Sequence, residues 1–199
     1  MPTIRRAAVL SRTGRPLVHV PQATYPGLVL GQIAIRTPEL DDAERVGRAH
    51  SVAADEAYGS YFPRDWMFQR NTPAKRTEQW HQLLSEPAPE GQLRRVRIAE
   101  AGEKVLGFGI FGTARDADAP VGFELHRLYV LSEAYGSGLS DRLLHELTPE
   151  RPAHYLWVME QNRRAIAYYR KRGYWHDGAV ERLPTIANLP KTRMVWSPQ

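Results

Sequence analysis

The chain has 199 residues, of which 42% are hydrophobic and 25% charged, an ordinary globular composition that supports one well-cored domain. It contains no cysteine, which excludes disulfides, zinc–thiolate sites and cysteine nucleophiles. No stretch approaches the roughly 18 apolar residues that a membrane span needs, and no charged start followed by an apolar run indicates a secretory signal. We therefore expect a cytoplasmic protein with no membrane partner.

The net charge of +5 originates in the N-terminal segment. Five arginines and no acidic residue precede Glu39, so the remaining chain is electrically balanced. Prolines in the same segment interrupt any amphipathic helix. We predict that residues 1–30 form a basic arm or extra strands, and that residues 31–199 form a single domain. A basic arm raises RNA as an alternative partner, but the neutral body argues against nucleic acid.

The first half of the predicted domain contains a strand, two helices and an aromatic segment. Residues 32–36 alternate apolar and polar side chains, which predicts a short strand. The following Thr37-Pro38 pair and nearby acids predict a helix with Thr37 as its N-cap. Residues 58–68 are rich in aromatics and contain Gly and Pro, so we interpret them as a loop that is either local core or an acceptor pocket. Thr72-Pro73 predicts the start of a second helix.

The second half alternates strands and helices. Apolar alternation predicts strands, and turn residues separate the first two into a hairpin. The predicted strands are residues 94–101, 104–112, 122–130, 154–159, 174–178 and 192–196, and the predicted helices are residues 139–148 and 162–172. Gly173 is expected to end the last helix. This mixture predicts an α/β or α+β fold around one central sheet.

The stretch "AYGSGLSDRLLHEL", residues 134–147, places a glycine turn between a strand and a helix. Backbone N–H groups and the positive end of the helix dipole meet at such a turn, which favours an anion such as a phosphate. A P-loop needs Gly-Lys-Ser/Thr, which is absent, and a dinucleotide fingerprint needs a small residue where Asp141 stands. The turn alone remains a weak signal, compatible with a plain tight turn.

A second segment makes the pattern more specific. The stretches "ELHRLYVLSEAYGSGLSDRLL" and "LWVMEQNRRAIAYYRKRGYWHDG" together resemble the GNAT N-acetyltransferase family. The matching positions are Tyr135, Gly138, Ser140, Asn162, Ala165, Tyr169, Gly173 and Tyr174. The resemblance implies a GNAT fold, with a central mixed, mostly antiparallel sheet flanked by helices, and acetyl-CoA as co-substrate. Tyr135 stands where the family usually has Arg or Gln, and Ser140 where it has Gly or Ala.

The resemblance also implies which residues hold coenzyme A. The backbone amides of Gly136, Ser137, Gly138, Leu139 and Ser140 would cradle the pyrophosphate, beside Tyr135. The strand edge formed by Leu128, Tyr129 and Val130 would bind the pantetheine arm like an added strand, and the N–H of Val130 is the expected oxyanion donor. Asn162, Ala165 and Tyr169 lie on one helix face and complete the expected cofactor site. No arrangement of residues predicts a metal site.

Two residues are expected to perform the chemistry of acetyl transfer to an amine. Glu124 matches the spacing of the general base in histone-acetylating members, and strand alternation would put it on one face with His126, Leu128 and Val130. A carboxylate that merely pairs with an arginine remains the alternative, and His126 is the reserve base. Tyr169 is the expected general acid for the departing thiolate, with a buried structural tyrosine as the alternative.

Two other functions stay open at this point. The departures at Tyr135 and Ser140 suggest a catalytically inactive acyl-CoA-binding sensor or scaffold. The basic arm suggests an RNA-associated acetyltransferase. The acceptor, a small molecule or a protein, is not identified by the sequence, and the family resemblance makes a homodimer a reasonable expectation.

Overall fold

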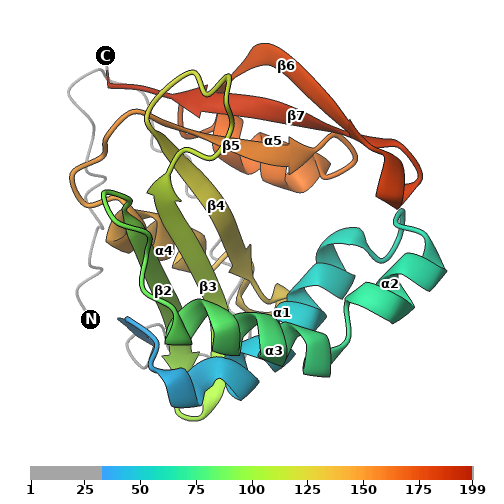
Figure 1. Ribbon diagram of the computed structural model, residues 1–199, viewed down its shortest axis with the longest axis vertical. Helices are drawn as coiled ribbons and strands as arrows, with labels where there is room; N and C mark the ends of the chain where they lie inside the picture. Colours follow the sequence, from blue (N-terminus) through green and yellow to red (C-terminus); the bar gives the residue numbers. More distant parts are fainter. Residues whose placement is uncertain (1–32, 199) are drawn as a thin grey trace, which may run out of the picture.

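The structure, a computed structural model, describes residues 33–198, so the predicted arm at residues 1–30 lies outside the described part (Figure 1). The strands are β1 (Ala34–Arg36), β2 (Arg94–Ala101), β3 (Lys104–Thr113), β4 (Phe123–Val130), β5 (His154–Met159), β6 (Trp175–Leu183) and β7 (Leu189–Trp196). The helices are α1 (Ala43–Tyr58), α2 (Arg64–Arg70), α3 (Pro73–Ser85), α4 (Leu139–Leu147) and α5 (Arg163–Arg170), with short 3-10 turns η2 (Leu40–Asp42), η3 (Ser132–Ala134) and η4 (Pro184–Ile186).

The strands form one seven-stranded sheet in the order β1-β2-β3-β4-β5-β7-β6. Among the strands of residues 33–198, only β4 and β5 pair in parallel, and the other pairs are antiparallel. The predicted fold class, a mixed and mostly antiparallel sheet with flanking helices, is therefore confirmed. None of the helices among residues 33–198 is long and apolar enough to cross a membrane.

Helices cover both faces of the sheet (Figure 1). On one face, α1 and α3 pack on β2 and β3 through a core that includes Val46, Trp80 and Phe108. On the other face, Leu139 and Leu143 of α4 pack against Leu106 and neighbouring apolar residues. A third cluster joins α4, α5 and the C-terminal strands. Burial of these apolar faces supplies the main driving force for folding.

Three helix boundaries agree with the local sequence signals. The Thr72 hydroxyl accepts a hydrogen bond from the N–H of Lys75, so this residue caps α3 as predicted. The helix α4 starts after Gly138, whose φ of +82° favours glycine. Gly173 has a φ of +86° just beyond α5, which is why the helix stops there.

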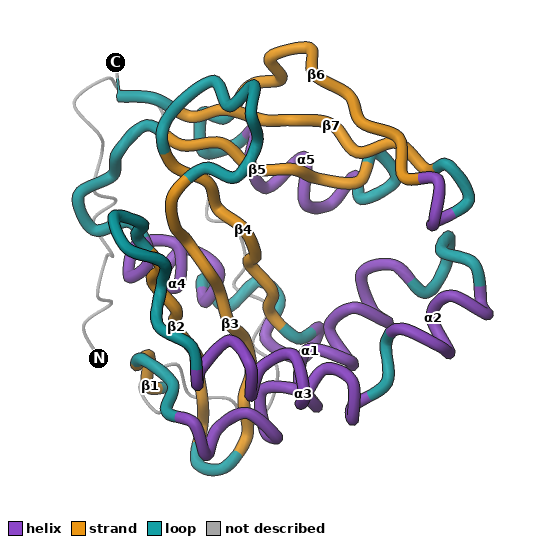
Figure 2. The backbone as a smooth tube through the Cα atoms, in the orientation of Figure 1, coloured by secondary structure: helices purple, strands orange, loops and turns teal. Residues whose placement is uncertain are grey.

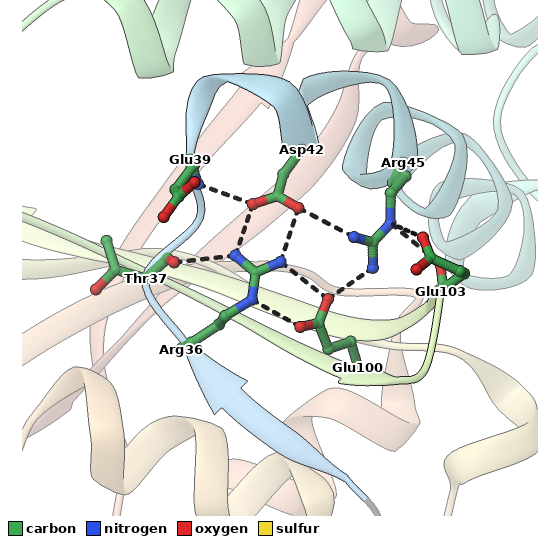
Figure 3. Close-up of polar contacts among 7 residues, drawn as sticks. All are labelled: Arg36, Thr37, Glu39, Asp42, Arg45, Glu100 and Glu103. Carbon is green, nitrogen blue, oxygen red and sulfur yellow. Dashed lines mark hydrogen bonds and ion pairs between the residues drawn. The ribbon is translucent and has the colours of Figure 1, made fainter.

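The first helix begins later than predicted, because Thr37 does not cap it. The turn η2 comes first, and the Asp42 carboxylate accepts the N–H of Glu39 at 2.8 Å. The same carboxylate binds Arg36 through two bonds of 2.6 and 2.8 Å, and Glu100 binds that guanidinium from β2 (Figure 3). This tertiary ion-pair network sets the helix start, which the local Thr-Pro signal alone could not predict.

The aromatic segment is also different from the predicted loop. It contains the short helix α2, which begins directly after Pro63. The side chains of Phe62 and Met67 are buried against Met159 and Ile186, which joins α2 to the C-terminal strands. Four of its five aromatic side chains, those of Tyr58, Tyr61, Phe62 and Trp66, belong to this cluster or pack against it, whereas Phe68 is 83% exposed. The prediction of a loop was wrong because tertiary packing stabilises a helix too short to persist alone.

Candidate active site

Residues of β4 and β5 line a cavity, which we call the wedge. The two strands pair at a single residue pair, Glu124 with Tyr155, and then diverge, as Figure 2 shows. The N–H of Leu131 bonds the carbonyl of Leu106 directly opposite on the β3 side. By antiparallel alternation, the backbone N–H and C=O groups of Leu128 and Val130 point the other way, toward the wedge. This edge can accept an extended ligand through backbone hydrogen bonds.

A bulge in β4 corrects the predicted faces of that strand. Ile110 pairs with Arg127 and Phe111 with Leu125, which leaves His126 as the extra residue. Leu125, not Glu124, therefore joins Leu128 in the cluster packed on α4 and α5. The predicted sharing of one face by Glu124, His126, Leu128 and Val130 was wrong, since the strand does not keep a strict two-residue period.

The glycine turn opens onto the same wedge. Gly136 and Gly138 both have positive φ, and no atom lies within 4 Å of the place where a Cβ would stand on either residue. The structure describes no acceptor for the N–H groups of Gly136, Gly138 and Ser140. Free donors and open space at a helix start are what a pyrophosphate requires. Ser137 instead folds back and donates to the carbonyl of Ala134 at 2.6 Å, and Leu139 is buried in the core.

The acidic residue near this turn is neutralised by its neighbours. Both oxygens of Asp141 pair with the Arg172 guanidinium, and the Tyr168 hydroxyl donates to one of them at 3.1 Å. The bonds from Arg172 keep the pKa of Asp141 below its usual value. Asp141 is therefore an ionised, paired group, which weakens its repulsion of a bound phosphate.

An arginine from α5 lies over the residue that departs from the family pattern. The Arg164 guanidinium stacks 3.6 Å above the Tyr135 ring, and it donates to the hydroxyl of the same tyrosine at 2.6 Å. Both residues line the wedge. A positive charge thus stands beside the glycine turn even though position 135 itself is uncharged. The sequence alone does not indicate this role of Arg164, because its link to Tyr135 depends on the packing of α5 against the turn.

The wedge has a volume of about 300 Å³. Its lining includes nine of the residues predicted to hold the cofactor, namely Leu128, Tyr129, Val130, Tyr135, Gly136, Ser140, Asn162, Ala165 and Tyr169. Ser137, Gly138 and Leu139 lie in the turn or behind it and do not line the cavity. Asn162 caps α5, since its Oδ1 accepts the N–H of Ala165 at 3.1 Å.

Tyr169 lies at the wall of this cavity with a phenol that bonds nothing among residues 33–198. Its side chain is largely buried, and burial raises the pKa of Tyr169 above the usual value, with Tyr174 adding to the shift. The group therefore stays protonated and can donate a hydrogen bond. Tyr168 differs, because its hydroxyl already donates to Asp141.

Glu124 is buried and bound by other side chains. Arg115 donates to both of its oxygens, at 2.9 and 2.5 Å, and the Tyr155 hydroxyl lies 3.3 Å from Oε2. Glu124 is 2% exposed and does not line the cavity. Its Oε2 lies 3.6 Å from Nε2 of His126. His126 itself lines the cavity. The residue predicted as the base therefore has no direct contact with the cavity, and His126 stands between the two.

His126 has one nitrogen held and one available. Nε2 lies 3.1 Å from the carbonyl of Thr113, so the neutral ring donates its proton there and leaves Nδ1 unprotonated. No partner of Nδ1 is described. Burial lowers the pKa of His126, Arg115 lowers it further, and Glu124 opposes the shift. The ring is therefore neutral at pH 7 and can accept a proton.

Comparison with protein families decides the classification. The model of the acetyltransferase (GNAT) family matches residues 52–174, which is more than half of the chain. The chain belongs to the GNAT acetyltransferase family. This confirms the resemblance on which the sequence analysis relied, and the match spans both the glycine turn and α5.

A curated protein is similar to part of the chain. A probable N-acetyltransferase of Mycobacterium tuberculosis is 31% identical over 83 residues, which are 41% of this chain and 47% of that protein. The match thus spans about half of the relative's length. It supports the enzyme class and leaves the substrate open.

Solved GNAT structures share the fold over most of the chain. A ribosomal-protein-alanine N-acetyltransferase from Brucella melitensis is 22% identical with a TM-score of 0.61, covering 83% of this chain and 99% of that one. The PaiA N-acetyltransferase from Thermoplasma acidophilum, in complex with coenzyme A, is 18% identical with a TM-score of 0.60 over 83% and 99% of the chains. At these identities the likeness establishes the fold alone.

Proposed function

We propose that the protein transfers the acetyl group of acetyl-CoA to a primary amine by direct attack. The observation that supports this most is the continuity of one cavity from the open glycine turn to the unpaired edge of β4 and the free hydroxyl of Tyr169. The residues present fit coenzyme A, since donors and space lie where its pyrophosphate would bind. Acetyl-CoA supplies an activated thioester carbonyl.

The chain's own groups would position and polarise the reactants. The N–H groups of Gly136, Gly138 and Ser140 would hold the pyrophosphate, and Arg164 would add a cation beside it. The edge at Leu128 and Val130 would bind the pantetheine arm as an added strand. The outward N–H of Val130 would then stabilise the negative charge that develops on the carbonyl oxygen.

The proton transfers divide between two sides of the cavity. The amine nitrogen forms a bond to the carbonyl carbon, the carbon–sulfur bond breaks, and the amine loses one proton while the sulfur gains one. We assign proton removal to Nδ1 of His126. Glu124 would be a positioning residue, since its negative charge raises the pKa of the His126 ring. Tyr169 would donate to the departing thiolate.

Calorimetric titration with acetyl-CoA tests the cofactor site. We expect micromolar binding by the wild type and loss of at least ~10-fold in affinity for Gly138→Glu, because the side chain would fill the phosphate space. The matched control is Gly91→Glu, since Gly91 also has positive φ and open space but lies away from the cavity. Absent binding by the wild type, or equal loss in both variants, would contradict the cofactor site.

Thiol release in the presence of an amine panel tests the chemistry. We expect Tyr169→Phe to lower kcat by roughly 100-fold with unchanged acetyl-CoA affinity. Tyr168→Phe is the control and should keep its rate. Cofactor binding without release for any amine would instead support the sensor or scaffold function. The homodimer and the RNA-associated arm stay predictions.

A further inference from the structure

Arg127 is a half-buried arginine at the cavity, and no partner of its guanidinium is found in the described part of the chain. It lies on β4 and lines the same cavity as Tyr58 and Tyr129. Among residues 33–198, no carboxylate, carbonyl or aromatic ring is described as a partner of its guanidinium. Burial lowers the pKa of Arg127, which shows that the group is partly withdrawn from water. An arginine kept in this state is unfavourable unless a ligand compensates its charge.

The Arg127 side chain and the helix of the glycine turn lie on opposite faces of β4. Residues 127–130 follow regular pairing with β3, so neighbouring side chains alternate between faces. Val130 packs with Leu139 and Leu143 of α4, the helix that begins at the glycine turn. Tyr129 packs in the opposite core, beneath α1 and α3. Arg127 therefore points to the α1 side and away from the site proposed for the pyrophosphate.

The side chains described as lining the cavity are neutral or positive. The described cavity lining contains Arg127, Arg164 and His126 but neither Asp nor Glu. Arg164 is engaged with Tyr135, which leaves Arg127 as the unpaired cation among these lining residues. Behind it, Arg76 is held by the amide oxygens of Asn71 and Gln79, at 2.9 Å each.

The aromatic groups beside Arg127 add no negative charge. The hydroxyls of Tyr58 and Tyr129 lie 2.8 Å apart and bond each other. Burial lowers the pKa of His50 to about 2, with Arg76 and Arg127 contributing, so this buried ring is neutral. Among the described residues that line the cavity, a substrate with several positive charges would meet no carboxylate, and Arg127 would repel it. A substrate with a negative group would be attracted.

We propose that the acceptor is a primary amine that also carries a compact oxyanion, a carboxylate or a phosphate, and that Arg127 binds this oxyanion. The guanidinium presents a planar fork of donors that suits both groups. Binding there would fix one end of the acceptor on the α1 side of β4. This inference rests on the proposed acetyl transfer and specifies its substrate class.

Matched pairs of amines test the charge requirement in the full-length protein with acetyl-CoA. One arm compares free amino acids with their carboxamides, and a second compares O-phosphoethanolamine with ethanolamine. Thiol release gives kcat/KM for each compound. In the arm whose oxyanion matches the natural acceptor, we expect kcat/KM for the anionic amine to exceed that for its neutral partner by about 10-fold or more. The arm that responds distinguishes a carboxylate from a phosphate.

Arg127→Gln tests the assigned residue. We expect it to lower kcat/KM for the preferred anionic amine by about 10- to 100-fold, mainly through KM, with unchanged affinity for acetyl-CoA and unchanged rates for neutral amines. Arg70→Gln is the matched control, because Arg70 is an exposed arginine of α2 outside the cavity lining. Titration with acetyl-CoA verifies that both variants remain folded and competent.

Three outcomes would overturn the inference. Neutral or polycationic amines could be preferred, Arg127→Gln could lower all rates equally, or no panel member could react although acetyl-CoA binds. Failure of the wild type to bind acetyl-CoA is a separate result, which removes the proposed function itself.

Discussion

At the scale of single residues, the assignment of the base makes a prediction about pH. The pKa of His126 is lowered by burial and by Arg115, so the neutral ring should persist below pH 6.5. A base acts when deprotonated, so protonation of His126 should lower kcat only on the acid side of that value. Arg115→Gln removes a lowering influence, and its acid limb should move to higher pH. Rate profiles from pH 5 to 9 compare the acid limb of the wild type with that of the variant.

Two further variants separate His126 from Glu124. If His126 takes the proton, His126→Gln should lower kcat by roughly 100-fold and abolish the acid limb. Glu124→Gln should keep a titrating limb and shift it to lower pH, because Glu124 raises the pKa of the ring. The opposite pattern, with the limb surviving in His126→Gln and lost in Glu124→Gln, would assign the base to Glu124.

At the scale of elements, one ion-pair network joins the first strand and helix to the sheet. Arg36 of β1 binds Asp42 and Glu100, and Arg45 of α1 binds the same two carboxylates (Figure 3). The Asp42 side chain is 6% exposed, whereas that of Arg36 is 36% exposed. Removal of Arg36 leaves the buried Asp42 carboxylate with less positive charge to balance it, which lowers the free energy of unfolding. Because Arg36 is partly exposed, solvent screening limits that loss.

We expect Arg36→Met to lower the free energy of unfolding by about 2 kcal/mol, measured as the urea midpoint at constant m. The control is Arg48→Met, which breaks the exposed pair with Glu44 on α1. An exposed pair of this kind contributes about 0.3–0.5 kcal/mol. Equal losses in the two variants would show that the network adds nothing beyond an ordinary surface pair.

At the scale of the whole molecule, buried histidines couple folding to pH. Burial lowers the pKa of His50 to about 2, while its Nδ1 accepts the Trp80 indole N–H at 3.2 Å. Burial also lowers the pKa of His154, which lies 2.5 Å from the Tyr174 hydroxyl. Below pH 6.5 the unfolded chain binds protons that the folded protein does not, so stability falls as pH falls.

For His50 alone, a fall from pH 6.5 to pH 5 should lower the free energy of unfolding by roughly 2 kcal/mol. Urea unfolding at both pH values measures the loss. His50→Asn keeps an acceptor for Trp80 but cannot titrate, so the pH dependence should shrink by that amount. The pKa values of Asp42 and Glu100 are also lowered, from 3.8 and 4.5. Their contribution to stability is lost only below those pH values, which is a separate pH range from that of His50. An unchanged slope in the variant would contradict the burial of a neutral His50.

Local signals in the sequence were enough for most elements and for much of the candidate cofactor site. Positive φ at Gly138 and capping by Thr72 depend on neighbouring residues alone, and strand and helix periods are local too. The spacing between the glycine turn and Tyr169 indicated the family because both segments keep a fixed motif. These features were readable without knowing which distant segments meet.

Tertiary structure decided the features that require a distant partner. The start of α1 depends on Glu100 from β2, and the bulge at His126 depends on the register with β3. The same packing binds Glu124 to Arg115, while Arg127 has no ion-pair partner among residues 33–198. A sequence pattern records each residue's type and period, but ion pairing and desolvation depend on which charges fold within a few ångströms of one another.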